Sequence, residues 1–165
     1  MHPVILFSLL VTSLLLPGCM TSYTKNKRPP PVTAWVIRIE TSGGIAGGGA
    51  GGVVVSSDRT IVATKPGPQG KAKPCEGKLS EQELKELSDS VEQSTPDEWK
   101  ISGPNAAAPD AFSYTLELQT ESEEGKQVHR IGWFDNTREL VPADVKRLYE
   151  AANQAKIAAL KKCAS

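Results

Sequence analysis

Hydrophobic and polar residues alternate along several stretches of the chain, and this period of two predicts β-strands. In residues 35–40, the side chains of Trp35, Ile37 and Ile39 fall on one face of a half-buried strand. Residues 112–120 alternate most regularly, and an acidic loop at residues 121–125 then turns the chain back. Further strands are predicted at residues 53–55, 60–63 and 127–134, the first two forming one hairpin and the last pairing with residues 112–120 in another.

Two helices are predicted from hydrophobic residues that recur at helical spacing. Ser80 and Glu83 have the spacing of a capping box, so the first helix begins at Ser80 and ends near Ser94. Pro142 suits the first turn of the second helix. The buried stripe of this second helix is Val145, Leu148, Tyr149, Ala152, Ala159, Leu160 and Cys163.

The predicted order of elements is βββ-α-ββ-α, with a loop at residues 65–74 that is rich in Pro and Gly. An antiparallel sheet of four to five strands with two helices packed against it satisfies this order. We therefore expect a single α+β domain over residues 34–163.

The N-terminal residues predict export. Residues 4–16 form an apolar run too short to span a bilayer and typical of a signal peptide. The run ends in Leu16-Pro17-Gly18-Cys19, which resembles the lipobox of bacterial lipoproteins. That resemblance implies that residues 1–18 are a signal peptide and that Cys19 carries lipids. The lipids would anchor the protein to a membrane. The alternative is an ordinary secretory signal with a chance cysteine.

Residues 19–33 then form a Pro-rich tether containing Lys25, Lys27 and Arg28. The expected location is the bacterial cell envelope. Because Met20, and not Asp, follows Cys19, the outer membrane is favoured if the source is Gram-negative.

Charge and histidine content argue against several functions. The 19 basic and 19 acidic residues cancel, so no electrostatic signal points to nucleic acid. Removal of the signal peptide takes His2 away and leaves His129 as the one histidine. Catalysis near neutral pH relies most often on histidine, so we expect neither an enzyme nor catalytic residues. His129 itself is predicted to be a partly buried structural residue beside Ile131 and Trp133.

The remaining cysteines, Cys75 and Cys163, form an even pair in an exported chain and predict a disulfide. Free thiols are one alternative. A metal site with His129 is another, but the three residues show no recognised ligand spacing, so no metal is expected.

Residues 47–52 (GGGAGG) match a degenerate dinucleotide-binding fingerprint. That fingerprint needs a helix directly after it, whereas β-branched residues follow here. We therefore expect no nucleotide and no small-molecule cofactor. A flexible loop or a bulged hairpin connection explains the glycines better, and its amides could pair with the edge strand of another protein.

Four stretches in a fixed order resemble the emfourin-type inhibitors of protealysin and related thermolysin-like zinc metallopeptidases. They are residues 39–47 (IETSGGIAG), residues 109–114 (PDAFSY), residues 128–131 (VHRI), and Val141-Pro142 before a helix. The resemblance covers about residues 35–152. Ile45 stands where that family usually has an aromatic residue, and Thr41 replaces a common basic one.

The resemblance implies a protein-binding function. One hypothesis is an envelope-anchored inhibitor of a thermolysin-like metallopeptidase. The other is a structural or ligand-binding envelope lipoprotein without inhibitory activity. The candidate contact surface is the matched turn, which consists of Ser42, Gly43, Gly44, Ile45, Ala46 and Gly47.

Overall fold

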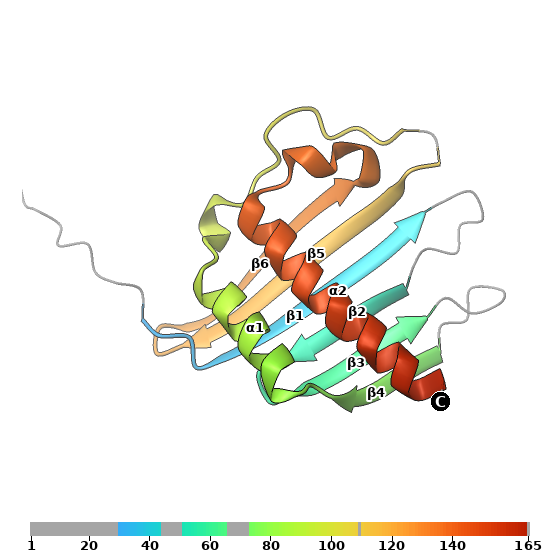
Figure 1. The fold of residues 1–165 in the computed structure, drawn as a ribbon. Helices are drawn as coiled ribbons and strands as arrows, with labels where there is room; N and C mark the ends of the chain where they lie inside the picture. The colour runs from blue at the N-terminus through green and yellow to red at the C-terminus, as the bar shows by residue number, and fades with distance from the viewer. Residues whose placement is uncertain (1–29, 44–50, 66–72, 109, 165) are drawn as a thin grey trace, which may run out of the picture.

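The fold is an antiparallel sheet with two main helices on one face, described here from a computed structural model (Figure 1). The structure describes residues 30–43, 51–65, 73–108 and 110–164. The strands are β1 (Ala34–Gly43), β2 (Gly51–Ser56), β3 (Thr60–Lys65), β4 (Lys73–Lys78), β5 (Phe112–Ser122) and β6 (Gly125–Phe134). The helices are α1 (Glu81–Glu92), α2 (Ala143–Ala164) and two short 3-10 helices, η2 (Pro96–Glu98) and η3 (Asp135–Leu140).

The predicted α+β class is confirmed, whereas the predicted number of strands is wrong. The sheet has six strands in the order β4-β3-β2-β1-β5-β6. The additional strand is β4, which begins inside the loop predicted at residues 65–74 and pairs with β3 along its length. Strand β4 lies at the sheet edge and has the sequence KPCEGK. Its one buried hydrophobic residue is Cys75. Such an edge strand has no hydrophobic alternation to detect.

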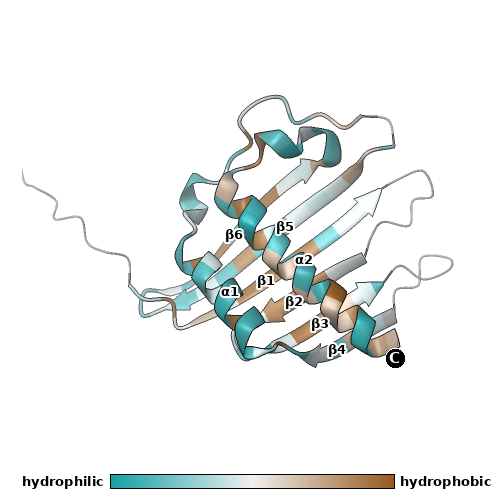
Figure 2. Cartoon of the chain, in the orientation of Figure 1, coloured by the Kyte–Doolittle hydropathy of each residue, from teal (hydrophilic) through white to brown (hydrophobic). Residues whose placement is uncertain are grey.

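The long central strands behave as their alternation predicts. Strand β1 pairs with β2 on one side and with β5 on the other, and Ile39 lies opposite both Val53 and Leu116. Trp35, Ile37 and Ile39 are all buried on the helix-covered face. Figure 2 shows hydrophobic residues along β1, β2 and β3 beneath the helices. The core therefore lies between one face of the sheet and the helix pair.

Helix α1 begins where its sequence predicts. The amide of Glu83 donates to Oγ of Ser80 at 3.2 Å, and the amide of Ser80 donates to the Glu83 carboxylate at 2.7 Å. These two bonds are the reciprocal capping box. Leu87 and Val91 are buried, while Leu84 packs against the core from a partly buried position. The helix ends at Glu92, close to the predicted end.

Helix α2 crosses the sheet diagonally, from the side of β6 to that of β4 (Figure 1). Near its first turns, Tyr149 meets Trp133 and Tyr114 edge-on, with ring centres 5.5 and 5.7 Å away. Tyr114 and Trp133 stack on each other at 5.6 Å across β5 and β6. This aromatic cluster of Tyr114, Trp133 and Tyr149 fixes the N-terminal half of α2 over the sheet.

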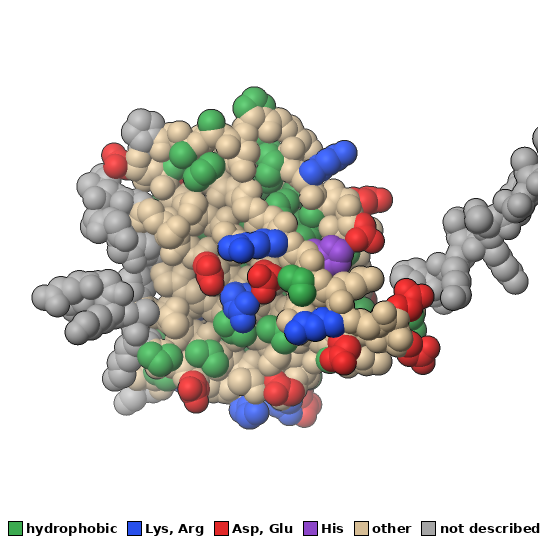
Figure 3. Space-filling view, turned by 180° about the vertical axis from the view of Figure 1, so that it is seen from behind, with side chains coloured by type: hydrophobic (Ala, Val, Ile, Leu, Met, Phe, Trp, Pro, Cys, Tyr) green, Lys and Arg blue, Asp and Glu red, His purple; other side chains and the backbone are tan. Residues whose placement is uncertain are grey.

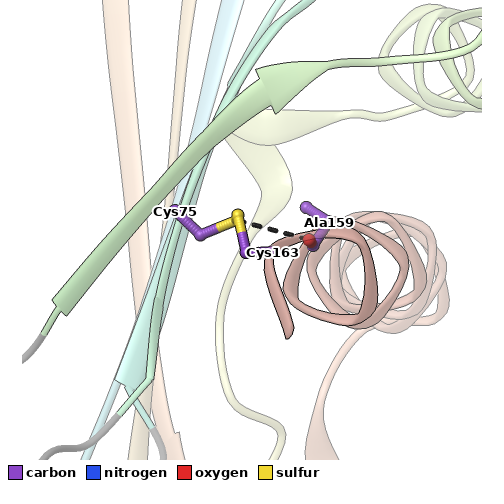
Figure 4. The surroundings of a disulfide bond; sticks show 3 residues. All are labelled: Cys75, Ala159 and Cys163. Carbon is purple, nitrogen blue, oxygen red and sulfur yellow. Dashed lines mark hydrogen bonds between the residues drawn. A yellow bond between two sulfur atoms is a disulfide. The ribbon is translucent and has the colours of Figure 1, made fainter. Parts of the chain in front are cut away.

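The C-terminal end of α2 is fixed by the predicted disulfide, which is confirmed. Cys75 of β4 and Cys163 of α2 are bonded, with their Cα atoms 6.2 Å apart. The sulfur of Cys75 lies 3.3 Å from the carbonyl oxygen of Ala159, one helical turn before Cys163 (Figure 4). The bond therefore joins the last turn of α2 to the edge strand of the sheet.

Loss of the disulfide is expected to lower the free energy of unfolding. Because the two cysteines are 88 residues apart, the chain-entropy account gives roughly 4–5 kcal/mol for the paired change Cys75→Ser with Cys163→Ser. Urea unfolding of the oxidised wild type and the double variant measures it. An unchanged midpoint, or two alkylatable thiols in the native exported protein, would contradict this account.

Candidate functional site

The strands of the sheet run between two opposite ends, which the pairing register identifies. At the end that we call the loop end, Gly43 of β1 pairs with Phe112 of β5, and Lys65 of β3 pairs with Lys73 of β4. At the opposite end, which we call the tether end, Ala34 pairs with Glu121. The ten residues of β1 separate the two ends by about 30 Å. The chain enters the described domain at the tether end.

The first residues of the candidate contact turn lie at the loop end. Ser42 is exposed and its hydroxyl lies 2.7 Å from that of Ser113. Gly43 has φ +93°, a backbone conformation that disfavours side chains. A Cβ atom on Gly43 would lie 2.6 Å from the carbonyl oxygen of Ala111. The other predicted turn residues, Gly44, Ile45, Ala46 and Gly47, lie outside the described residues.

The position of Gly43 predicts a large cost for Gly43→Ala. Gly125, which turns β5 into β6, also has positive φ, but a Cβ there meets nothing within 4 Å. Gly125→Ala should therefore lose only the conformational term, about 1–2 kcal/mol. Gly43→Ala should lose about 1–3 kcal/mol more, because the Ala111 backbone must move.

Thermal and denaturant unfolding of both variants measures the difference. Equal destabilisation by Gly43→Ala and Gly125→Ala would show that the close approach to Ala111 does not constrain the loop end.

A second candidate site is a groove of about 690 Å³ at the tether end. Its walls come from Pro30–Val32, the end of α1, η2, and the strands β5 and β6. Buried Val91 and Leu118 provide an apolar floor. Four carboxylates line it, those of Glu92, Asp97, Glu98 and Glu124, and the described lining contains no Lys or Arg. Sequence analysis missed this groove, because the acidic residues come from three separate segments.

His129 lies in the wall of the groove. Its side chain is 19% exposed, and Nδ1 lies 3.7 Å from a carboxylate oxygen of Asp97. The Trp99 ring meets the imidazole edge-on at 6.4 Å. His129 shares its strand face with Ile131 and Trp133, as the alternation predicts. Within the described residues, no group of three His, Cys, Asp or Glu side chains could hold a metal ion.

Asp144 holds the wall of the groove against the start of α2. Its Oδ2 accepts hydrogen bonds from the amide of Thr95 at 3.0 Å and from Nε1 of Trp99 at 2.8 Å. Partial burial alone would raise the pKa of Asp144. The bonds from Thr95 and Trp99, with one from the amide of Val145, outweigh that effect and lower the pKa. The ionised carboxylate is therefore the form that the folded protein stabilises.

This arrangement predicts a pH-dependent contribution to stability. A lowered folded-state pKa stabilises the protein fully above about pH 4, the unfolded value, and the contribution is lost as the pH falls through the lower folded-state pKa. Asp144→Asn keeps an acceptor but cannot ionise. Wild type should unfold at higher denaturant than Asp144→Asn at pH 7, and the gap should shrink at pH 3. An equal gap at both pH values would contradict this assignment.

The sheet face away from the helices carries a mixed row of charged and apolar side chains. Figure 3 shows basic and acidic side chains beside one another on this face. The register aligns Glu76, Val62, Val54, Arg38, Glu117 and Arg130 across the six strands. Arg38 donates to Glu117 at 2.8 Å. A face that carries charged side chains in this way is typical of the solvent-facing side of an antiparallel sheet.

Cys19, the predicted lipidation site, lies outside the described residues. Across the residues that are described, no helix has the length and apolar character needed to cross a membrane. Comparison with known protein families, with curated proteins and with solved structures finds no match to this chain.

Proposed function

We propose that this protein is a lipid-anchored envelope protein whose domain inhibits a thermolysin-like zinc metallopeptidase. The observation that supports the proposal is the separation of the two ends of the sheet. The described domain begins at the tether end, and Ser42 and Gly43 of the emfourin-like turn lie about 30 Å away at the loop end. An anchor on Cys19 would hold the tether end near the bilayer and leave Ser42 and Gly43 at the end farther from it.

Inhibition of this kind needs a rigid surface and no catalytic group. Ser42 is backed by Ser113 on the adjacent strand, and Gly43 lies against the backbone of Ala111. Strand β5 therefore supports the first two residues of the candidate contact turn. A surface supported in this way can block an active-site cleft and exclude substrate at a low cost in conformational entropy.

Titration of the protein into a thermolysin-like metallopeptidase acting on a peptide substrate tests the inhibitor function. We expect micromolar or lower concentrations to slow cleavage. Gly43→Ala should weaken inhibition about tenfold or more, equivalent to about 1.4 kcal/mol, because the turn changes shape. Gly125→Ala, at the tether end, is the matched control and should inhibit as wild type does. Both variants are compared at a temperature where both are folded.

Failure to slow the protease at micromolar concentration would favour the second function, a structural or ligand-binding envelope lipoprotein. The acidic groove is the observation that favours this second function, because it offers an apolar floor with polar walls. A metallopeptidase gene beside the gene for this chain would instead favour inhibition.

The lipid anchor has its own test. Cys19→Ser should abolish incorporation of labelled fatty acid and release most of the protein from membranes, because the acyl chains supply the membrane affinity. Met20→Ser leaves Cys19 in place and is the control, which should stay labelled. Persistent lipid labelling of Cys19→Ser would contradict the proposed anchor.

A further inference from the structure

The acidic groove has a cationic segment of the same chain directly beside it. Pro30, Pro31 and Val32 form part of the groove wall, so the chain reaches the domain along the groove itself. The residues just before Pro30 include Lys25, Lys27 and Arg28. Even the farthest, Lys25, is five residues from Pro30, a reach of about 17 Å in an extended chain.

The charges of the two parts are complementary. Three of the 19 basic residues and none of the 19 acidic residues precede residue 30, so residues 30–165 carry 16 basic against 19 acidic side chains. The first part therefore has a formal charge of +3 and the second −3. Within the second part, Glu92, Asp97, Glu98 and Glu124 gather in the groove without a Lys or Arg in its described lining.

The groove also offers both an apolar floor and a charged rim to a bound peptide. It is open to solvent on the side of the exposed Asp97 and Glu98, while Leu118 and Val91 close its floor. Aliphatic stems of lysine or arginine can pack on apolar surface while their charged ends reach carboxylates at the rim. The rim charges would then be paired with cations at short range.

We propose that this groove is a binding site for a basic peptide, and that its occupant is the chain's own segment at residues 25–28. The bound segment would hold the middle of the tether against the domain and fix the direction in which the rest of the tether leaves it. Because the same cations would attract anionic lipid headgroups, binding in the groove would compete with the membrane surface for them. This inference does not depend on protease inhibition.

Nuclear magnetic resonance of the 15N-labelled full-length protein in neutral detergent tests the proposal. Lys25→Ser with Lys27→Ser should shift the amide signals of Asp97, Glu98 and Gln127. The matched control, Lys65→Ser with Lys161→Ser, removes the same charge far from the groove and should leave those signals in place. Raising the salt from 0.1 M to 1 M, which shortens the Debye length from about 10 Å to about 3 Å, should shift the wild-type groove signals toward those of the variant.

Added tetralysine separates the chain's own segment from an outside ligand. It should shift the groove signals in the Lys25→Ser, Lys27→Ser variant, whose own segment keeps only Arg28 of its three cations, and several-fold less in wild type. Equal shifts in both would show that the groove is open in wild type and would overturn the intramolecular occupant. No shift in either protein, or shifts only of amide signals on the sheet face away from the helices, would show that the groove does not bind basic peptides.

Discussion

The attachment of α2 at both of its ends determines most of this architecture. The helix has 22 residues, about 33 Å, whereas six strands span about 24 Å, so a diagonal crossing lets a single helix cover every strand. The cluster of Tyr114, Trp133 and Tyr149 holds one end, and the bond from Cys163 to Cys75 holds the other. With α2 in place, α1 fills the remaining part of the same face, and the groove forms where α1 ends.

The same constraint links the two candidate sites. Asp144 at the first turn of α2 binds Thr95 and Trp99, which positions η2 and the groove wall. Continuous pairing of β1 with β5 joins the tether end of the sheet to Gly43 at the loop end. A domain built in this way can hold a tether at one end and present a binding surface at the other. Neither role requires a catalytic residue.

The sequence predicted the parts of the fold where one physical signal dominates. Alternation in β1 and β5 reflects one buried and one exposed face, and the capping box of Ser80 and Glu83 is a local arrangement of four atoms. The disulfide followed from the even pair of cysteines, Cys75 and Cys163, that remains once Cys19 is assigned to the lipobox. Strand β4 was missed because it is stabilised by pairing with β3 and by Cys75, not by hydrophobic residues of its own.

The sequence did not predict the groove either, because the groove depends on tertiary packing and not on a local pattern. Its carboxylates, on Glu92, Asp97, Glu98 and Glu124, come from α1, η2 and the turn between β5 and β6. Only the packing of α1 beside these strands brings them together. In the sequence, these four residues look like the acidic residues of any solvent-exposed segment. At the candidate contact turn, the family resemblance proposed Ser42 and Gly43, whereas the approach of Ala111 to Gly43 depends on the pairing of β1 with β5.

In the proposed function, the loop end binds a protein partner while the tether end faces the membrane. Hydrogen–deuterium exchange of the protein bound to a thermolysin-like metallopeptidase tests it most directly. Binding at the loop end should slow exchange at Ser42, Gly43 and the start of β5, and leave exchange unchanged at the turn that contains Gly125. Slower exchange at the Gly125 turn, with none at Ser42 and Gly43, would contradict it.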